Sequence, residues 1–248
     1  MVWTREVKSS RSSLIVRAAA LFSWAAFFPP TANAQTIPAF PGAEGTGAYA
    51  KGGRGGDVYH VTNTNASGAG SLADGLTVSV PAAGRTIVFD VSGYAHISGE
   101  LRITASKITI AGQTAPGDGF GLKDGTFRVS ADDIVIRHMR FRDGNSADAI
   151  DLDSGSLNSI FDHCDAMLSN DENFSSFNSP PENMTFQWGV NAWGMESHSA
   201  GGLWDQNHAT CHHSLWAHNH TRNPKARPTL LDWRNNVTFD WEIGRAHV

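Results

Sequence analysis

A short alternation of apolar or small residues around one intervening residue recurs along the chain. Its copies occupy residues 108–110, 134–136, 159–161, 184–186, 209–211 and 237–239, and successive copies begin 26, 25, 25, 25 and 28 residues apart. A period of two places every second side chain on one face and is typical of a β-strand. We therefore predict a short strand at each copy. Asn158, Asn183 and Asn236 directly precede three copies, and asparagine favours the turn before a strand.

The nearly constant spacing predicts an all-β fold, a single-stranded parallel β-helix with coils of about 25 residues. In such a solenoid each strand pairs with its copy one coil away, at about 4.8 Å along the axis. One coil cannot bury its inner face alone, so the coils stack into a continuous core. A β-sandwich is the alternative, because its strands also follow one another at short intervals. A sandwich, however, does not require one pattern to recur at a constant spacing.

The coil register predicts that several polar residues lie on one lateral side of the solenoid. Counted from the start of the preceding copy, Asp148, Asp171, Glu172, His198 and Arg222 fall at offsets 14, 12, 13, 14 and 13. Stacked coils place equal offsets above one another. A row of acids followed by a cation suits a linear anionic chain that a metal ion bridges.

Composition excludes several classes of protein. The chain has 248 residues, of which 40% are hydrophobic and 17% charged, values unlike those of a disordered tail or a coiled coil. A net charge of -5 leaves no basic surface for nucleic acid. Cys164 and Cys211 lie two coils apart in the predicted register, about 9.6 Å, which is too far for a disulfide. We expect both to be reduced and buried.

The two ends of the chain are interpreted separately from the fold. Residues 1–34 combine basic residues, the apolar run 18–28 and the small-residue sequence Ala32-Asn33-Ala34, which is the pattern of a secretory signal peptide. A short membrane anchor is the alternative. We expect a mature protein that begins at Gln35 and is secreted, extracellular or periplasmic, with no membrane attachment. Residues 242–248 match the translation of a common sequencing-adapter read, so we interpret them as an artefact and the domain as incomplete; a genuine tail is the alternative.

Several segments resemble one known family. They read AFPGAEGTGAYAKGGRGGDVYHVTN (39–63), TIVFDVSG (86–93), ITIAGQTAPGDG (108–119), IFDHC (160–164), ATCHHSLWAHN (209–219) and TRNPKAR (221–227). Together, in this order, they resemble the secreted bacterial pectate lyases of polysaccharide lyase family one. The resemblance covers residues 37–240 and implies a right-handed parallel β-helix over residues 35–241. It also implies Ca²⁺-dependent cleavage of polygalacturonate, an acidic plant cell-wall polysaccharide, by β-elimination. We expect a monomer.

The resemblance implies a role for each matching residue. Asp148 matches a calcium ligand, and Asp171 matches the first acid of a second ligand pair. The second acid of that pair falls on Ser175, for which Glu172 is the candidate replacement. Another acid of the ligand group falls near Ser146. Two carboxylates of the family's calcium site are therefore replaced.

The resemblance also assigns the substrate and the base. Arg222 matches the catalytic arginine, and Arg227 matches an arginine that binds the uronate carboxylate. The family has a substrate-binding lysine near residues 196–205, where this chain has none and His198 is the nearest substitute. Elimination removes the C5 proton next to a carboxylate, and a hard cation with an arginine would stabilise the resulting charge. Because a guanidinium loses a proton only at high pH, we expect activity to rise at alkaline pH.

Other interpretations of the polar and aromatic residues are weaker. The histidines considered as zinc ligands are His198, His208, His212, His213, His218 and His220. Adjacent residues of a strand point to opposite faces, so His212 and His213 are not expected to bind one ion together, and no cysteine or carboxylate completes a zinc set at a recognisable spacing. We expect His163 and His212 to lie in stacked rows. Core packing is the default expectation for the tryptophans of the last third of the chain.

Two further functions stay open at this point. One is a lyase for a methylated or different uronan that does not bind calcium tightly, which the replaced acids and the missing lysine favour. The other is a non-catalytic β-solenoid that binds polysaccharide. A glycoside hydrolase is less favoured, because the sequence has no recognisable pair of catalytic acids.

Overall fold

The structure is a computed structural model that describes residues 37–142, 147–153, 156–176, 182–195, 198–227 and 230–241. The chain divides into two units, Met1–Gln35 and Thr36–Val248. The predicted signal peptide (1–34) and the predicted artefact (242–248) lie outside the described residues. Within the described part, no helix is both long enough and apolar enough to span a bilayer.

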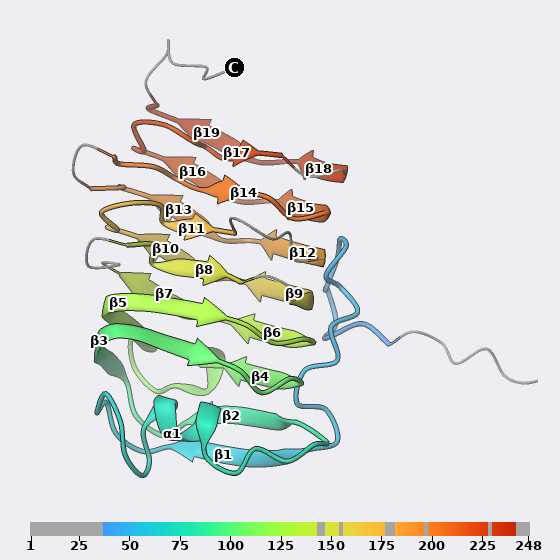
Figure 1. Cartoon of the computed structure of the whole chain (residues 1–248), viewed down its shortest axis with the longest axis vertical. Helices are drawn as coiled ribbons and strands as arrows, with labels where there is room; N and C mark the ends of the chain where they lie inside the picture. The colour runs from blue at the N-terminus through green and yellow to red at the C-terminus, as the bar shows by residue number, and fades with distance from the viewer. Residues whose placement is uncertain are drawn as a thin grey trace, which may run out of the picture. The chain divides into compact units, whose positions relative to one another are not determined.

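Parallel strands stacked coil upon coil build the second unit (Figure 1). The first sheet consists of β1 (Asp57–Val61), β2 (Arg85–Phe89), β4 (Ile108–Ala111), β6 (Ile134–Arg137), β9 (Leu157–Asp162), β12 (Glu182–Gln187), β15 (His208–His212) and β18 (Leu230–Arg234). Strands that neighbour one another in this sheet belong to successive coils and pair in parallel. The all-β parallel β-helix that the repeat predicts is therefore confirmed.

The second sheet follows the order β11-β8-β5-β7-β10-β13-β16-β19, and β3 pairs with β5. Its strands are β3 (Gly93–Ile103), β5 (Phe120–Val129), β7 (Met139–Arg142), β8 (Ile150–Leu152), β10 (Asp165–Met167), β11 (Phe174–Ser175), β13 (Val190–Ala192), β16 (Leu215–Ala217) and β19 (Val237–Phe239). The long strand β5 pairs with β7 through its first half and with β8 through its second half. A third, two-stranded sheet contains β14 (Leu203–Trp204) and β17 (Lys225–Ala226).

Two short helices lie among the N-terminal coils. The α-helix α1 (Leu72–Thr77) begins after Ser71, whose side chain accepts a hydrogen bond from the amide of Asp74 and so caps the helix. The 3₁₀ helix η1 (Gly112–Thr114) follows β4 directly. Leu72 and Leu76 of α1 are buried in the main core.

Five of the six predicted strands lie in the first sheet, but the sixth does not. Ala209 pairs with Leu231 of β18, whereas Val237 pairs with Leu215 in the second sheet. The strand predicted at 237–239 is therefore confirmed as β19, but its predicted pairing with the copy at 209–211 is wrong. Strands of both sheets show the same alternation, so the pattern alone does not tell which sheet a strand belongs to. The last coil is also shorter than 25 residues, so the spacing does not tell it either.

The core follows the inward side chains of the first sheet from coil to coil. Ile87, Ile110, Ile136, Phe161, Phe186 and Cys211 form one continuous row of paired positions, and all are fully buried. Cys164 and Cys211 are free and buried, as predicted. Burial raises the pKa of each thiol to about 12. Two tryptophans, Trp204 and Trp216, are buried in this core.

The expectation of core packing fails for two other tryptophans. Trp188 and Trp193 are 49% and 52% exposed. Trp188 stacks between the rings of His163 and His213, and Trp193 stacks on His218. These residues have left-handed backbone angles at the turns that follow the strands, so their rings lie outside the core. The predicted stacked row for His163 is confirmed.

An N-terminal segment, residues 37–56, lies across the outer face of the first sheet, and we call it the strap (Figure 1). Its backbone amides donate to the hydroxyls of Thr109, Thr185 and Thr210, which are middle residues of the repeated strands. The apolar middle residues Val135 and Ile160 pack against Ala50 of the strap. The outward residues of β4, β6, β9, β12 and β15 are thereby covered by the strap, whereas Val58 of β1 in the same row is exposed.

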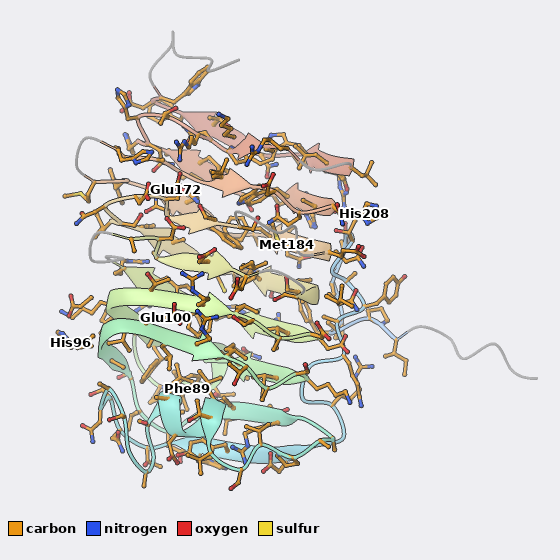
Figure 2. The ribbon with its side chains drawn as sticks, viewed as in Figure 1. Phe89, His96, Glu100, Glu172, Met184 and His208 are labelled. Carbon is orange, nitrogen blue, oxygen red and sulfur yellow. The ribbon has the colours of Figure 1, made fainter. Side chains whose placement is uncertain are left out.

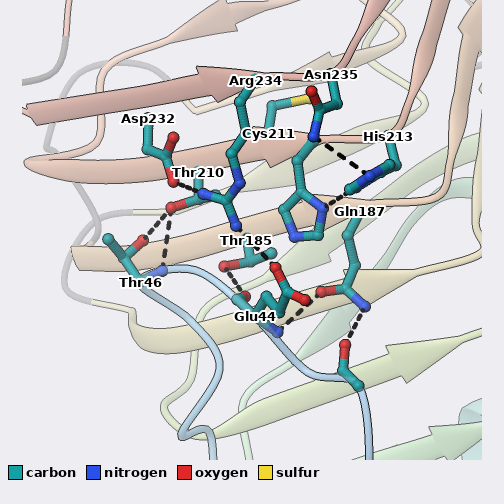
Figure 3. A network of polar contacts seen from close by, with 12 residues as sticks. Glu44, Thr46, Thr185, Gln187, Thr210, Cys211, His213, Asp232, Arg234 and Asn235 are labelled. Atoms are coloured by element: carbon teal, nitrogen blue, oxygen red, sulfur yellow. Dashed lines mark hydrogen bonds and ion pairs between the residues drawn. The ribbon is translucent and has the colours of Figure 1, made fainter.

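The strap also makes polar contacts with a row of polar side chains along the edge of the first sheet (Figure 3). Gln187 accepts from the amide of Glu44 and donates to the carbonyl of Gly42, and Arg234 contacts the Glu44 carboxylate at 2.9 Å. His212 lies in this row between Gln187 and Arg234 and is fully buried. Burial, with Arg234 as a second cause, lowers the pKa of His212.

The prediction that His212 and His213 point to opposite faces is wrong. The strand ends at His212, and His213 takes a left-handed backbone with φ of 53°. This turn brings the Nδ1 atoms of the two rings to 2.7 Å. The alternation of a strand does not continue through a left-handed residue.

Candidate functional site

Five of the predicted site residues lie in turns that precede strands of successive coils. Asp148 comes before β8, Asp171 and Glu172 come before β11, His198 comes before β14, and Arg222 comes before β17. Parallel bridges align the turns, because Glu172 pairs with Ala200 and Ala200 pairs with Thr221. Glu172 is labelled in Figure 2, among the side chains of these coils.

Direct contacts join these five residues, and we call them the acidic cluster. The amide of Glu172 donates to Oδ1 of Asp148 at 2.9 Å. Nδ1 of His198 lies 2.9 Å from Oδ1 of Asp171, and the guanidinium of Arg222 contacts the carboxylate of Glu172. The coil register therefore places Asp148, Asp171, Glu172, His198 and Arg222 together, as the sequence predicts.

Burial differs strongly within the acidic cluster. The side chain of Glu172 is 6% exposed, whereas those of Asp171 and His198 are 40% and 46% exposed. Burial and, as the second cause, the nearby charge of Asp171 raise the pKa of Asp148 to about 7. A hydrogen bond with Ser175 opposes this shift. The hydroxyl of Ser175 thus contacts the cluster at Asp148. Ser146 lies outside the described residues.

Arg227 lies beyond the cluster on the same chain segment. It follows β17, and its Nη2 lies 3.0 Å from Oδ2 of Asp205. Its side chain is 49% exposed. Arg227 therefore lies at the surface, paired with the carboxylate of Asp205.

A group of asparagine side chains next to the acidic cluster was not predicted from the sequence. The Nδ2 of Asn173 donates to Oδ1 of Asn191 and of Asn219, at 3.2 and 3.0 Å. The side chain of Asn219 donates in turn to Asn223 at 2.8 Å. Asn173 follows Glu172 in the chain, and Asn223 follows Arg222, so these buried amides fix the two turns relative to each other. Asparagines directly after site residues were the available sequence signal.

The acidic cluster fits a divalent cation. Oδ1 of Asp171 and Oε1 of Glu172 are buried and make no hydrogen bond, only the ion contacts with His198 and Arg222 described above. Buried carboxylates without hydrogen bonds are costly unless a cation compensates their charge. Calcium takes oxygen ligands with flexible geometry and completes its shell with water or substrate. Asp148, Asp171 and Glu172 are the carboxylates that would hold such an ion.

A second group of potential ligands lies at the edge of the first sheet. It contains His138, Asp162 and His163, whose ligand atoms lie within 4.8 Å of one another. The carboxylate of Asp162 is only 1% exposed and already accepts from Arg137 and Gln187, each at 2.7 Å. Sequence analysis did not single out this group.

The raised pKa of Asp148 predicts a pH-dependent stability in the metal-free chain. Its folded pKa exceeds the unfolded value of 3.8, so the folded state binds a proton more tightly between about pH 4 and pH 7. The free energy of unfolding should therefore fall as pH rises through that window. Burial raises the pKa of Asp151 to about 6, which adds an effect of the same sign.

Asp148→Asn should reduce the fall in the free energy of unfolding with rising pH. It should stabilise the metal-free chain at pH 8 by about 1–3 kcal/mol. Urea unfolding at pH 4.5, 6 and 8 with chelator present measures the effect. Asp118→Ala, at an exposed position, is the control that should leave the pH dependence unchanged. Equal pH dependence in Asp148→Asn and the parent chain would contradict the expected burial of this carboxylate.

Comparison with known proteins identifies relatives in sequence and in fold. No model of a known protein family matches the chain. The chain is 40% identical over 229 residues to a probable pectate lyase C of Emericella nidulans. The aligned segment covers 90% of this chain and 52% of the relative. The chain is 41% identical over 220 residues to a probable pectate lyase C of Aspergillus flavus, covering 86% and 51%. The chain spans about half the length of the curated relatives it matches.

Two solved structures share the fold. A pectate lyase from a Bacillus species, in complex with trigalacturonate, has a TM-score of 0.56 at 17% identity and covers 79% of this chain and 68% of that chain. Jun a 1, the major allergen from cedar pollen, has a TM-score of 0.50 at 16% identity with the same coverage.

These comparisons support the resemblance to pectate lyases, but the curated sequence relatives that they identify are not bacterial. The curated relatives are fungal, whereas the sequence motifs were compared with bacterial enzymes. The chain is therefore a sequence relative of the fungal pectate lyases over about half of their length, with the parallel β-helix fold of a solved pectate lyase.

Proposed function

We propose that the chain carries the site of a secreted polysaccharide lyase that cleaves polygalacturonate by calcium-assisted β-elimination, with Arg222 as the base. The observation that carries the proposal is the acidic cluster, in which carboxylates and Arg222 from successive coils lie in contact. Two comparisons support it: the relatives are named pectate lyases, and a solved pectate lyase of the same fold contains trigalacturonate.

The reaction requires removal of a weakly acidic proton. The C5 proton of a uronate lies next to an ionised carboxylate, which accepts further negative charge poorly. Bound calcium would neutralise that carboxylate and stabilise the charge that develops on it. Asp148, Asp171 and Glu172 would hold the ion in this proposal. Glu172 also contacts the guanidinium of Arg222 and so keeps it beside the ion site.

Arg222 accepts the C5 proton in the proposed step. The electron pair of the C5–H bond forms the C4–C5 double bond, the C4–O4 bond breaks, and the departing sugar oxygen takes up a proton. A guanidinium is ordinarily protonated at neutral pH, so its base form becomes more populated at alkaline pH. Activity should accordingly rise with pH.

Arg227 and His198 bind the substrate in this proposal. Arg227 lies at the surface beside Asp205, where a uronate carboxylate can replace that partner. A planar guanidinium pairs well with a carboxylate through two parallel hydrogen bonds. His198 extends from the turn next to Asp171 and is half exposed, so its ring can reach a sugar hydroxyl. We propose further that the enzyme is a monomer that binds neither nucleic acid nor membrane.

A second candidate is a lyase for a methylated or different uronan. Ser175 replaces a carboxylate of the resembling family and is 1% exposed, so it contributes a hydroxyl but no charge to the ion site. A substrate whose carboxylate is already neutralised by esterification needs less help from a cation. This substrate class therefore fits a site with fewer acids.

An absorbance assay distinguishes the candidates. The full chain is incubated with polygalacturonate or with methyl-esterified pectin, each with Ca²⁺ or with chelator, at pH 5 to 10. Ultraviolet absorbance of unsaturated product from polygalacturonate, lost with chelator and greatest at alkaline pH, supports the first candidate. Product from esterified pectin without Ca²⁺ supports the second. Polysaccharide binding without product in every condition would contradict both and indicate a non-catalytic solenoid.

A further inference from the structure

Two neighbouring rows of side chains cross β3, β5 and β7 on the outer face of the second sheet, and we call them the basic face. One row contains Tyr94, Gly121 and Arg140, and the other contains His96, which is labelled in Figure 2, Lys123 and Arg142. The residues that alternate with them, such as Leu122 and Phe141, are buried in the core, so both rows face outward. The basic face lies on these strands, whereas the acidic cluster lies in the turns before β8, β11, β14 and β17.

Two cations of the basic face have no partner among the described residues. Lys123 and Arg140 are half-buried, and within the described part of the chain neither side chain forms an ion pair or a hydrogen bond. By contrast, Arg142 contacts Asp165 at 3.1 Å, and its guanidinium also donates to two carbonyl groups. Lys123 and Arg140 occupy diagonal positions on adjacent strands, with Cα atoms about 8 Å apart. One extended anionic chain can therefore contact both.

Two glycines leave room for an aromatic ring and a guanidinium on the basic face. A Cβ at Gly121 would lie 2.7 Å from Cδ1 of Tyr94 and closer still to Cε1, so the tyrosine ring leans over β5. A Cβ at Gly119, directly before β5, would lie 3.5 Å from Nη2 of Arg140, so the guanidinium leans over from the opposite side. The ring of Tyr94 and the guanidinium of Arg140 therefore lie over positions two residues apart in the chain.

The more exposed rings of the later coils lack this arrangement. Trp188 stacks between His163 and His213, so neighbouring rings cover both faces of its indole. The hollow beside Trp188 is lined by apolar residues such as Val190, and its lining includes no Lys or Arg. Tyr94, in contrast, is half-buried and stacks on no other ring of the described residues. A ligand can therefore contact its ring and a free guanidinium together.

An aromatic ring beside a guanidinium suits a sugar that carries a carboxylate. The C–H groups of a pyranose pack against an aromatic side chain, and the tyrosine hydroxyl can bind a sugar hydroxyl. A guanidinium pairs with a carboxylate through two parallel hydrogen bonds. Asp124 and Asp165 lie beside the cations, where they contact His96 and Arg142. These acids repel a densely charged phosphate chain, whereas a uronan presents a single carboxylate on each sugar.

We propose that the basic face is a second binding surface for an acidic sugar chain, a polyuronan, in addition to the substrate contacts proposed at the acidic cluster. Tyr94 packs against one sugar ring, Arg140 binds the carboxylate of that sugar, and Lys123 binds the carboxylate of a neighbouring sugar. The surface needs neither a metal ion nor lyase activity, because its contacts are one ring and two cations.

Isothermal titration calorimetry of the full chain with trigalacturonate tests the proposal. The titrations contain chelator and use an Arg227→Ala/His198→Gln background, which removes the substrate contacts proposed at the acidic cluster. This background should still bind trigalacturonate, and it should bind neutral galactotriose about 10-fold more weakly or worse, because the cations act on carboxylates. Adding Arg140→Gln should weaken trigalacturonate binding by about 10-fold or more, and adding Tyr94→Ala should weaken it by about 5-fold or more.

Arg54→Gln is the matched control, since it removes the same charge from an exposed arginine outside the basic face. It should change the affinity for trigalacturonate by less than about 2-fold. Tyr94→Phe keeps the ring and should change the affinity by less than about 3-fold. Three results would each overturn the proposal: no binding in the background, equal affinity with and without Arg140→Gln, or equal affinity for trigalacturonate and galactotriose.

Circular dichroism of each variant should match the parent chain. Lys123→Gln, which should weaken trigalacturonate binding by about 3-fold or more, takes the place of Arg140→Gln if that variant does not fold. Since the readout is binding, a negative lyase assay leaves this test unaffected.

Discussion

Arg222→Ala should abolish formation of unsaturated product from polygalacturonate, with a fall in kcat of about 1,000-fold or more, or ~4 kcal/mol of transition-state stabilisation. The reason is that Arg222 is the proposed proton acceptor and contacts the acidic cluster directly. KM should change much less than kcat, because Arg227 and His198 are the proposed substrate contacts. Initial rates from ultraviolet absorbance at saturating Ca²⁺ measure both constants.

The variant leaves the buried Glu172 carboxylate without its guanidinium, so folding needs a separate control. Arg222→Lys keeps a positive charge near Glu172 and should still lose at least 100-fold in kcat, because an ammonium does not present the same fork of N–H groups. Arg54→Ala changes an exposed arginine that donates to the carbonyl of Pro38 and should retain full activity. An Arg222→Ala enzyme with nearly normal kcat would exclude Arg222 as the base.

Gly47→Ala should destabilise the fold by about 3 kcal/mol or more, a large effect for the addition of one methyl group. A Cβ at this position would lie 2.0 Å from the carbonyl oxygen of Ser159 and 2.9 Å from the amide of Thr185. Both are backbone atoms of the first sheet, so neither can rotate away. Urea unfolding should show a lower midpoint, and Tm should fall by roughly 6–12 °C for a chain of this size.

Gly42→Ala is the control within the same strap. Its Cβ would meet nothing within 4 Å, but its φ of 91° is unfavourable for alanine. We expect a cost of about 1–2 kcal/mol from the backbone alone. Equal stability of Gly47→Ala and Gly42→Ala would show that the strap does not lie directly on the first sheet.

The repeat in the sequence was sufficient to predict the coils and the lateral position of the acidic cluster. The alternation of a strand is visible in its own short sequence. Coils of equal length then place residues at equal offsets above one another. Asp148, Asp171, Glu172, His198 and Arg222 could therefore be grouped before their contacts were known. The resemblance added roles to these positions, and those roles stay proposals.

Coil lengths that depart from the repeat could not be predicted in this way. The pattern at 237–239 was assigned to the first sheet, although Val237 belongs to the second sheet. Likewise, the left-handed turn at His213 reverses the direction that a continuing strand would give its side chain. Both errors arise where a turn, and not the strand pattern, sets the direction of the chain.

Contacts between distant segments were decided by the tertiary structure alone. The middle residues of the repeated strands, such as Thr185 and Thr210, are covered by the strap from more than 130 residues away in the chain, which their alternation does not indicate. Alternation records which side of its own strand a residue occupies, whereas the partner on that side depends on how the whole chain folds over it.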